Sequence, residues 1–294
     1  MLDTLTKILH SMTKSIEILY VLEGVKNVSR IIVNDSQVEK LTDYLSSFKL
    51  NLSISDFKIR KEVDELRQYS DKGFKIDKNS TEYGQVMLYV SRNKEYSENA
   101  KSYEARNEHF SLGEILGYPE CCINFFVKNF PIESKKKNDY VLASLRNSDG
   151  FKFSFYNNTA IRHLDLTLLS HFPCRFNCSA SLEIAKRNLK IVRILSVDLV
   201  RIFEDFLKSA VIYSSDLGVF VLRGIKVNEN EVHYNDVLGT TNNWLYKLLR
   251  ENQRIIIRDK NYFIIGNREI KGEDFAVMVF ENINILIAQN PQYR

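Results

Sequence analysis

Two short stretches organise this chain: Gly-Tyr-Pro-Glu-Cys-Cys at residues 117–122 and His-Phe-Pro-Cys-Arg-Phe-Asn-Cys at residues 171–178. Together they contain all four cysteines of the 294-residue sequence, and a proline precedes each group of cysteines. In a reducing compartment, paired cysteine clusters more often form a metal or redox site than a disulfide framework. The two stretches therefore predict one site that is assembled from two places in the sequence.

The residues around each cluster favour ionised thiols. Pro119 followed by an apolar segment predicts a short helix that ends at Pro131 and carries the first two cysteines in its first turn. After the second cluster, Asn177 or Ser179 is expected to cap a long helix. Unpaired N–H groups and the positive end of the helix dipole stabilise thiolates at both helix starts. The apolar stripe of that long helix has a period of 3.6 and consists of Leu182, Ala185, Leu189, Val192, Leu195, Leu199, Ile202 and Phe206.

The four thiols Cys121, Cys122, Cys174 and Cys178 are the predicted metal ligands. Four thiolates suit either zinc or an iron–sulfur cluster. Side chains of adjacent helical residues project about 100° apart, which a cluster of several irons accommodates better than one ion does. We therefore expect an iron–sulfur cluster ([4Fe–4S]) ahead of zinc. Metal-free catalytic or redox thiols and buried structural cysteines stay open as alternatives.

Three further residues near the cysteines are candidates for chemistry. His171 precedes Cys174 by three positions and would act as a ligand, as a hydrogen-bond partner or as a general acid/base. Glu120 is a candidate base. The helix dipole also stabilises a glutamate in the first turn, and this alone explains its position without any catalytic role. Arg175 lies between two thiolates and is the candidate cofactor-binding residue, either balancing their charge or binding an anionic substrate. The predicted catalytic pair is therefore His171 and Glu120.

The same two stretches resemble a known family. The Gly-Tyr-Pro-x-Cys-Cys pattern at 117–122, with the downstream His-x-Pro-Cys-x3-Cys pattern at 171–178 and Ser181, is similar to an uncharacterised prokaryotic family catalogued as a domain of unknown function. The resemblance covers about the middle third of the chain. It implies that the two clusters belong together, and it carries no established reaction.

The pattern of apolar residues predicts a mixed α+β fold in three parts. Residues 1–92 read as an N-terminal α/β unit, with a central strand at 86–90. Residues 93–210 form a central, mainly helical domain that carries the cysteine cluster. Residues 211–294 contain six strand candidates and predict a small antiparallel β domain.

Composition and missing motifs narrow the function. Net charge is only +4, which supports nucleic-acid binding weakly, and the sequence has neither an apolar run long enough for a membrane helix nor a recognisable signal peptide. A cytoplasmic location is expected. Glycine-rich phosphate loops and serine-hydrolase, radical and deaminase signatures are missing. We favour a metalloenzyme that modifies a small molecule or peptide. The alternatives are a zinc-stabilised module that binds protein or RNA, and a metal-free thiol redox protein.

Overall fold

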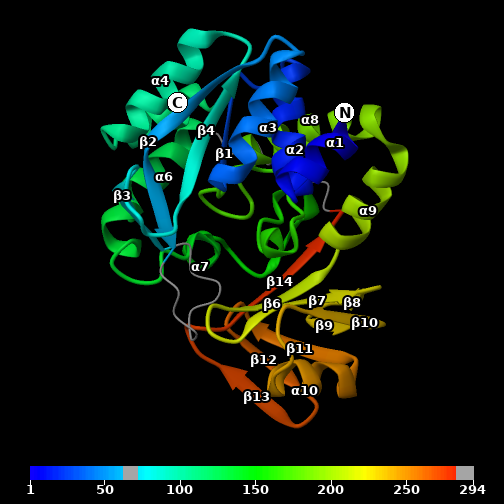
Figure 1. The fold of residues 1–294 in the computed structure, drawn as a ribbon. Coiled ribbons are helices and arrows are strands. Elements are labelled where there is room, and N and C mark those ends of the chain that lie inside the picture. The colour runs from blue at the N-terminus through cyan, green and yellow to red at the C-terminus, as the bar shows by residue number, and fades with distance from the viewer. Residues whose placement is uncertain (62–71, 283–294) are drawn as a thin grey trace, which may run out of the picture.

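The computed structural model describes residues 1–61 and 72–282 (Figure 1). Within these residues the chain forms ten α-helices and three β-sheets, two of them antiparallel and one mixed. The predicted α+β class is confirmed. In Figure 1 the first sheet lies at one end of the molecule, the other two sheets lie at the opposite end, and α7 (Tyr140–Arg146) lies in the region between them.

The first sheet is antiparallel throughout and has the strand order β1-β4-β2-β3. Strand β4 is an inner strand, as predicted, and both of its faces are buried because helices cover the sheet on either side. Val86, Leu88 and Val90 face a core formed with α1 to α3, and Met87 and Tyr89 face α4 and α5. The bounds are β1 (Val28–Val33), β2 (Asn51–Lys61), β3 (Gly73–Asp77), β4 (Gln85–Ser91), α1 (Leu2–Leu9), α2 (Met12–Leu22), α3 (Asp35–Ser46), α4 (Lys94–Ala105) and α5 (His109–Ile115).

The helices that follow are α6 (Glu120–Glu133), α7 (Tyr140–Arg146), α8 (Ser179–Leu195) and α9 (Val197–Leu207), with the 3₁₀ turns η1 (Phe155–Asn157) and η2 (Arg162–Leu164) between them. Of these helices, α6 carries the first cysteine pair, and α8 begins directly after the second cysteine stretch. Helix α6 does not end at Pro131, as was predicted, but continues to Glu133. Pro131 lies in the last turn, where the missing N–H removes a single hydrogen bond near the helix end.

The predicted long helix after the second cluster is wrong in two details. Ser196 divides it into α8 and α9: its backbone is extended, and its side chain accepts the Leu199 N–H, so it caps the second helix. The N-cap of α8 is Cys178 itself, with no side-chain hydrogen bond, and not Asn177 or Ser179.

The remaining two sheets are built mainly from residues after 209. The mixed sheet has the order β10-β7-β6-β14-β5, and β5 pairs in parallel with β14. The third sheet is antiparallel, with the order β13-β12-β11-β9-β8. All six predicted strands are present as β6 (Ala210–Ser214), β7 (Gly218–Arg223), β9 (Glu231–His233), β11 (Arg254–Asp259), β12 (Tyr262–Ile265) and β14 (Ala276–Glu281). The others are β5 (Lys152–Ser154), β8 (Lys226–Asn228), β10 (Asp236–Gly239) and β13 (Arg268–Lys271), with α10 (Trp244–Asn252).

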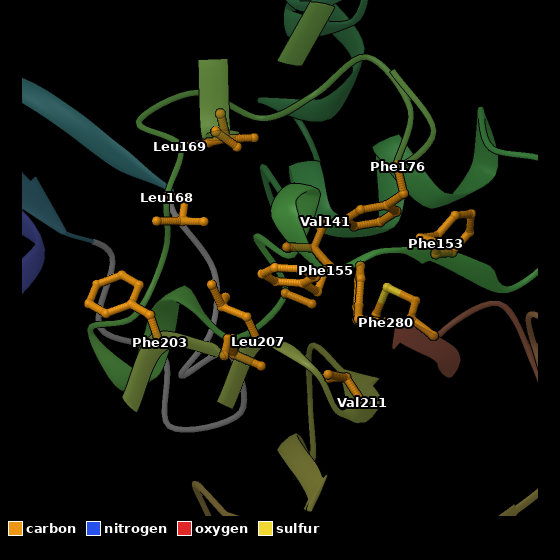
Figure 2. Close-up of a cluster of buried hydrophobic side chains, with 14 of the residues drawn as sticks. Val141, Phe153, Phe155, Leu168, Leu169, Phe176, Phe203, Leu207, Val211 and Phe280 are labelled. Atoms are coloured by element: carbon orange, nitrogen blue, oxygen red, sulfur yellow. The ribbon is translucent and has the colours of Figure 1, made fainter. Parts of the chain in front are cut away.

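One apolar core supports the second cysteine stretch (Figure 2). Phe176, between Cys174 and Cys178, is fully buried. Its ring packs 5.2 Å from that of Phe153 on β5 and 5.5 Å from that of Phe280 on β14. The cluster also includes Ile16 and Tyr20 of α2. This core therefore contains residues from each of the three predicted parts, and the division at 92 and 210 stays a prediction.

Candidate metal centre

The first pair of cysteines lies in the first turn of α6. The chain enters this helix through Gly117, whose φ of +74° is readily adopted by glycine, and Pro119 is the N-cap. Helix α5 packs closely against α6 at Gly113, where an added Cβ would lie 2.7 Å from the Cγ1 atom of Ile123. This close packing sets the position of the helix start that carries the thiols.

The second pair lies in a loop whose backbone is hydrogen-bonded by polar side chains of neighbouring segments. These side chains come from α7, from the residues that follow it and from η1, and all of them bind backbone groups of the loop. The hydrogen bonds run from Ser144 Oγ to the Pro173 carbonyl (2.6 Å), from Asn147 Nδ2 to the Cys174 carbonyl (2.8 Å), from the Phe176 N–H to Ser148 Oγ (2.8 Å), and from Asn157 Nδ2 to the carbonyls of Phe176 and Cys178 (3.0 Å each). The backbone around both cysteines is therefore fixed.

The four thiols lie together at the starts of α6 and α8. Their sulfur atoms all lie within 4.8 Å of one another. The Sγ–Sγ distances are 3.9 Å between Cys121 and Cys122, 3.7 Å between Cys121 and Cys178, and 3.8 Å between Cys122 and Cys178. The adjacent cysteines of α6 thus reach one point, although the helical angle between them suggested a larger centre. Four thiols in this arrangement are able to bind a metal.

Burial and the contacts among the thiols limit how many of them ionise without a cation. Hydrogen bonds from Cys122 and Cys174 lower the pKa of Cys178 far below its ordinary value. Contacts with Cys174 and Cys178, together with burial, raise the pKa of Cys122 far above it. Contact with Cys122 lowers the pKa of Cys174, but Cys178 and burial outweigh this and raise it to about 12. Burial and the Cys178 charge raise the pKa of Cys121. Without a cation these shifts favour a thiolate at Cys178 and oppose one at the other three cysteines.

His171 reaches the thiols through a serine. Its Nε2 atom lies 2.9 Å from Ser181 Oγ, and that oxygen lies 3.2 Å from Cys122 Sγ. When Cys122 is a thiolate, the Ser181 hydroxyl must donate to it, so Ser181 accepts the Nε2–H of His171. Burial, and then the charge of Lys26, lowers the pKa of His171 to about 3, which keeps the ring neutral. The Cys174 N–H also donates to Cys122 Sγ, at 3.2 Å.

Residues far away in the sequence support His171 on its other side. Lys26 forms an ion pair with Glu17 at 2.5 Å, and the Lys26 side chain is only 9% exposed. Its Nζ lies 5.4 Å from the centre of the Tyr118 ring, within the range of a cation–π contact. The Tyr118 and His171 rings lie 4.9 Å apart. The segment 17–26 therefore helps to fix the orientation of His171.

A surface hollow of about 720 Å³ opens beside the thiols and is lined by Cys121, Cys174, Cys178 and Arg175. Cys121 is exposed and Cys174 is half-buried, whereas Cys122 and Cys178 are buried. The three other predicted site residues thus lie in different places relative to the hollow. Arg175 lies on the open side, His171 is buried behind Ser181, and Glu120 is exposed at the start of α6 outside the residues that line the hollow.

Sequence reasoning assigned no role to several residues that contact the site. Ser181 follows Cys178 by three positions on α8, and Asn124, Phe125 and Lys128 follow Cys121 by three, four and seven on α6. These spacings place the side chains on the same helix face as the cysteines, so helical periodicity in the sequence indicates that they lie near the site. Nothing in the sequence indicates that Lys26 lies over the Tyr118 ring.

Comparison with known proteins finds one family model that matches the part of the chain containing the site. Residues 95–197 match a family model described as "Protein of unknown function (DUF483)". The matched segment runs from α4 to the start of α9 and includes all four cysteines, and the predicted resemblance is confirmed. No curated protein and no solved structure matches the chain. Within the described residues, no helix has the length and apolarity to cross a membrane.

Proposed function

We propose that Cys121, Cys122, Cys174 and Cys178 bind a single tetrahedral metal ion, with zinc as the expected ion. The observation that carries this proposal is the Sγ–Sγ spacing of 3.7 to 3.9 Å among three of the thiols. Zinc–sulfur bonds of about 2.3 Å imply edges of about 3.8 Å for a tetrahedron of thiolates. Cys174 Sγ lies within 4.8 Å of the other three sulfurs, so a small side-chain adjustment completes the set.

The same spacing argues against the iron–sulfur cluster that the sequence favoured. In a [4Fe–4S] cluster each thiolate binds a different iron, so the four sulfurs lie further apart than they do around one ion. A single iron held by four thiolates fits these distances as well as zinc does. Metal analysis therefore decides which ion is present.

The proposed ion joins two segments that are distant in the sequence. It connects the start of α6 to the loop before α8 and to the N-cap of α8. Four protein ligands leave no open coordination position, which is typical of structural zinc. Much of the binding free energy of such an ion is folding free energy. The main role of the centre is thus structural: it stabilises the folded segments that line the surface hollow beside the thiols.

A second candidate function is chemistry at the exposed side of the centre, as in an enzyme that modifies a small molecule or peptide. The specific observation in its favour is that Cys121 is exposed and faces the hollow, while Cys122 and Cys178 are buried. Metal-bound thiolates keep nucleophilic character when a substrate reaches them. A cytoplasmic location, where thiols stay reduced, suits either function.

The test is metal analysis and an ultraviolet–visible spectrum of protein purified without oxygen. We expect a colourless protein with about one zinc per chain. Cys178→Ala should lose the metal, and Ser47→Ala, which alters an exposed hydroxyl on a distant helix end, should keep it. A brown protein with several irons would contradict the single-ion centre. Neither metal, with a reversible disulfide, would point to a thiol redox protein.

A further inference from the structure

The hollow beside the thiols carries an excess of positive charge. Lys128, Arg146 and Arg175 line it, and among the described residues that line it there is no aspartate or glutamate. Arg146 forms an ion pair with the buried Glu133 at 2.5 Å. Lys128 and Arg175 are exposed, and neither forms an ion pair within the described part of the chain. Two full positive charges are thus available to a ligand.

The other lining groups suit a polar anion. Asn124 and Asn129 of α6 and Asn147 after α7 place amide groups around the hollow. Helix α8, which is 17 residues long and has no acidic residue in its first turn, begins at the hollow through Ser179 and Ala180. Its free N–H groups add partial positive charge on that side. The volume of about 720 Å³ lies within the usual range for small-molecule sites.

We propose that this hollow binds the phosphate group of a small phosphorylated molecule, held by Lys128 and Arg175 beside the thiol centre. A phosphate monoester carries a charge of about −1.5 to −2 at pH 7, which matches two unpaired cations better than a single carboxylate does. The guanidinium fork binds phosphate oxygens in pairs, and the lysine ammonium adds a point charge. This inference deepens the proposed function and rests on it, because the folded metal centre forms one wall of the hollow.

The competing account is that these cations only balance the centre. One divalent ion with four thiolates carries a net charge of −2, so Lys128 and Arg175 would then stabilise the metal and bind no ligand. The two accounts differ in what the loss of a cation changes. Phosphate affinity falls in the first, and zinc retention falls in the second.

The experiment is calorimetric titration of the purified full chain with inorganic phosphate and with glycerol phosphate at low salt, and with acetate as the singly charged comparison. Zinc content is measured on every sample. Lys128→Ala and Arg175→Ala are compared with Lys136→Ala, which removes the same charge from an exposed residue outside the hollow. Arg175→Lys keeps the charge and loses the fork.

We expect both phosphates to bind more tightly than acetate and glycerol phosphate to bind at least as tightly as inorganic phosphate. Lys128→Ala and Arg175→Ala should each weaken phosphate binding roughly tenfold or more with zinc content unchanged. Lys136→Ala should bind like the wild type, and Arg175→Lys should show an intermediate loss.

Three results would overturn the proposal: no phosphate binding by zinc-loaded wild type, equal binding in the alanine variants, or variants that lose zinc in place of phosphate affinity. A wild type that binds phosphate and contains no zinc contradicts the metal centre alone. The two proposals therefore fail separately.

Discussion

Replacing Ser181 with alanine isolates the contribution of one buried hydroxyl to the metal centre. Ser181 is fully buried, and its Oγ lies 3.2 Å from Cys122 Sγ and 2.9 Å from His171 Nε2. The change removes the hydrogen bond to the Cys122 thiolate and leaves the His171 N–H without this acceptor. It removes one oxygen atom, so the packing of α8 is little disturbed.

The magnitude follows from the charge on the acceptor. A hydrogen bond to a charged group contributes about 1.5 to 3 kcal/mol, and each 1.4 kcal/mol is about tenfold in an equilibrium constant. We therefore expect Ser181→Ala to weaken zinc binding by about 10- to 100-fold, the range usual for residues that support metal ligands.

The assay is competition with a chromophoric zinc chelator at pH 7, with circular dichroism to show that both proteins are folded. Ser47→Ala is the matched control, because its hydroxyl donates to the Tyr44 carbonyl on an exposed surface. Zinc affinity within twofold of the wild type for folded Ser181→Ala would refute the reasoning.

Three further predictions follow from other parts of the structure. Removing the metal with a chelator is expected to lower the free energy of unfolding by about 4 kcal/mol when free zinc had exceeded its Kd a thousandfold; an unchanged unfolding temperature would contradict this. Gly113→Ala should destabilise the protein by about 1 to 3 kcal/mol, because its Cβ would lie 2.7 Å from Ile123 Cγ1, and denaturant unfolding measures this. Burial acts to raise the pKa of the Glu104 carboxyl, but Arg30 and Tyr89 outweigh burial and hold this pKa below its ordinary value of 4.5. The wild type should therefore lose stability as the pH falls below 4.5, because the carboxylate that pairs with Arg30 becomes protonated. Glu104→Gln should therefore lose about 3 kcal/mol at pH 7 and show a flatter pH dependence in acid, and equal slopes for the two proteins would contradict the assignment.

Much of the fold followed from apolar patterning. The inner strand at 86–90 and the six later strands were predicted because β-branched and aromatic residues cluster there. Patterning could not predict the break at Ser196, since the apolar stripe continues across it and a local side-chain hydrogen bond decides where the second helix begins. The parallel pairing of β5 with β14 joins residues far apart in the sequence, and no local signal encodes such a contact.

For the site too, local sequence patterns predicted some features, and contacts between distant segments decided the others. Each cluster lies at a helix start, which the prolines and the following apolar stripe indicated. The sequence favoured a cluster of several irons from the angle between adjacent helical side chains, an argument that neglects how freely the χ1 torsions turn Cys121 and Cys122 towards one point. The placement of His171 behind Ser181 depends on the packing of Tyr118 and Lys26, which come from distant segments.

X-ray absorption of the purified protein tests the central claim most directly, because it reports the ion, its ligands and any neighbouring metal together. We expect a zinc edge and about four sulfur ligands at about 2.3 Å, with no second metal nearby. An iron edge with metal–metal scattering, or a zinc shell of mainly nitrogen and oxygen ligands, would contradict a single ion held by Cys121, Cys122, Cys174 and Cys178.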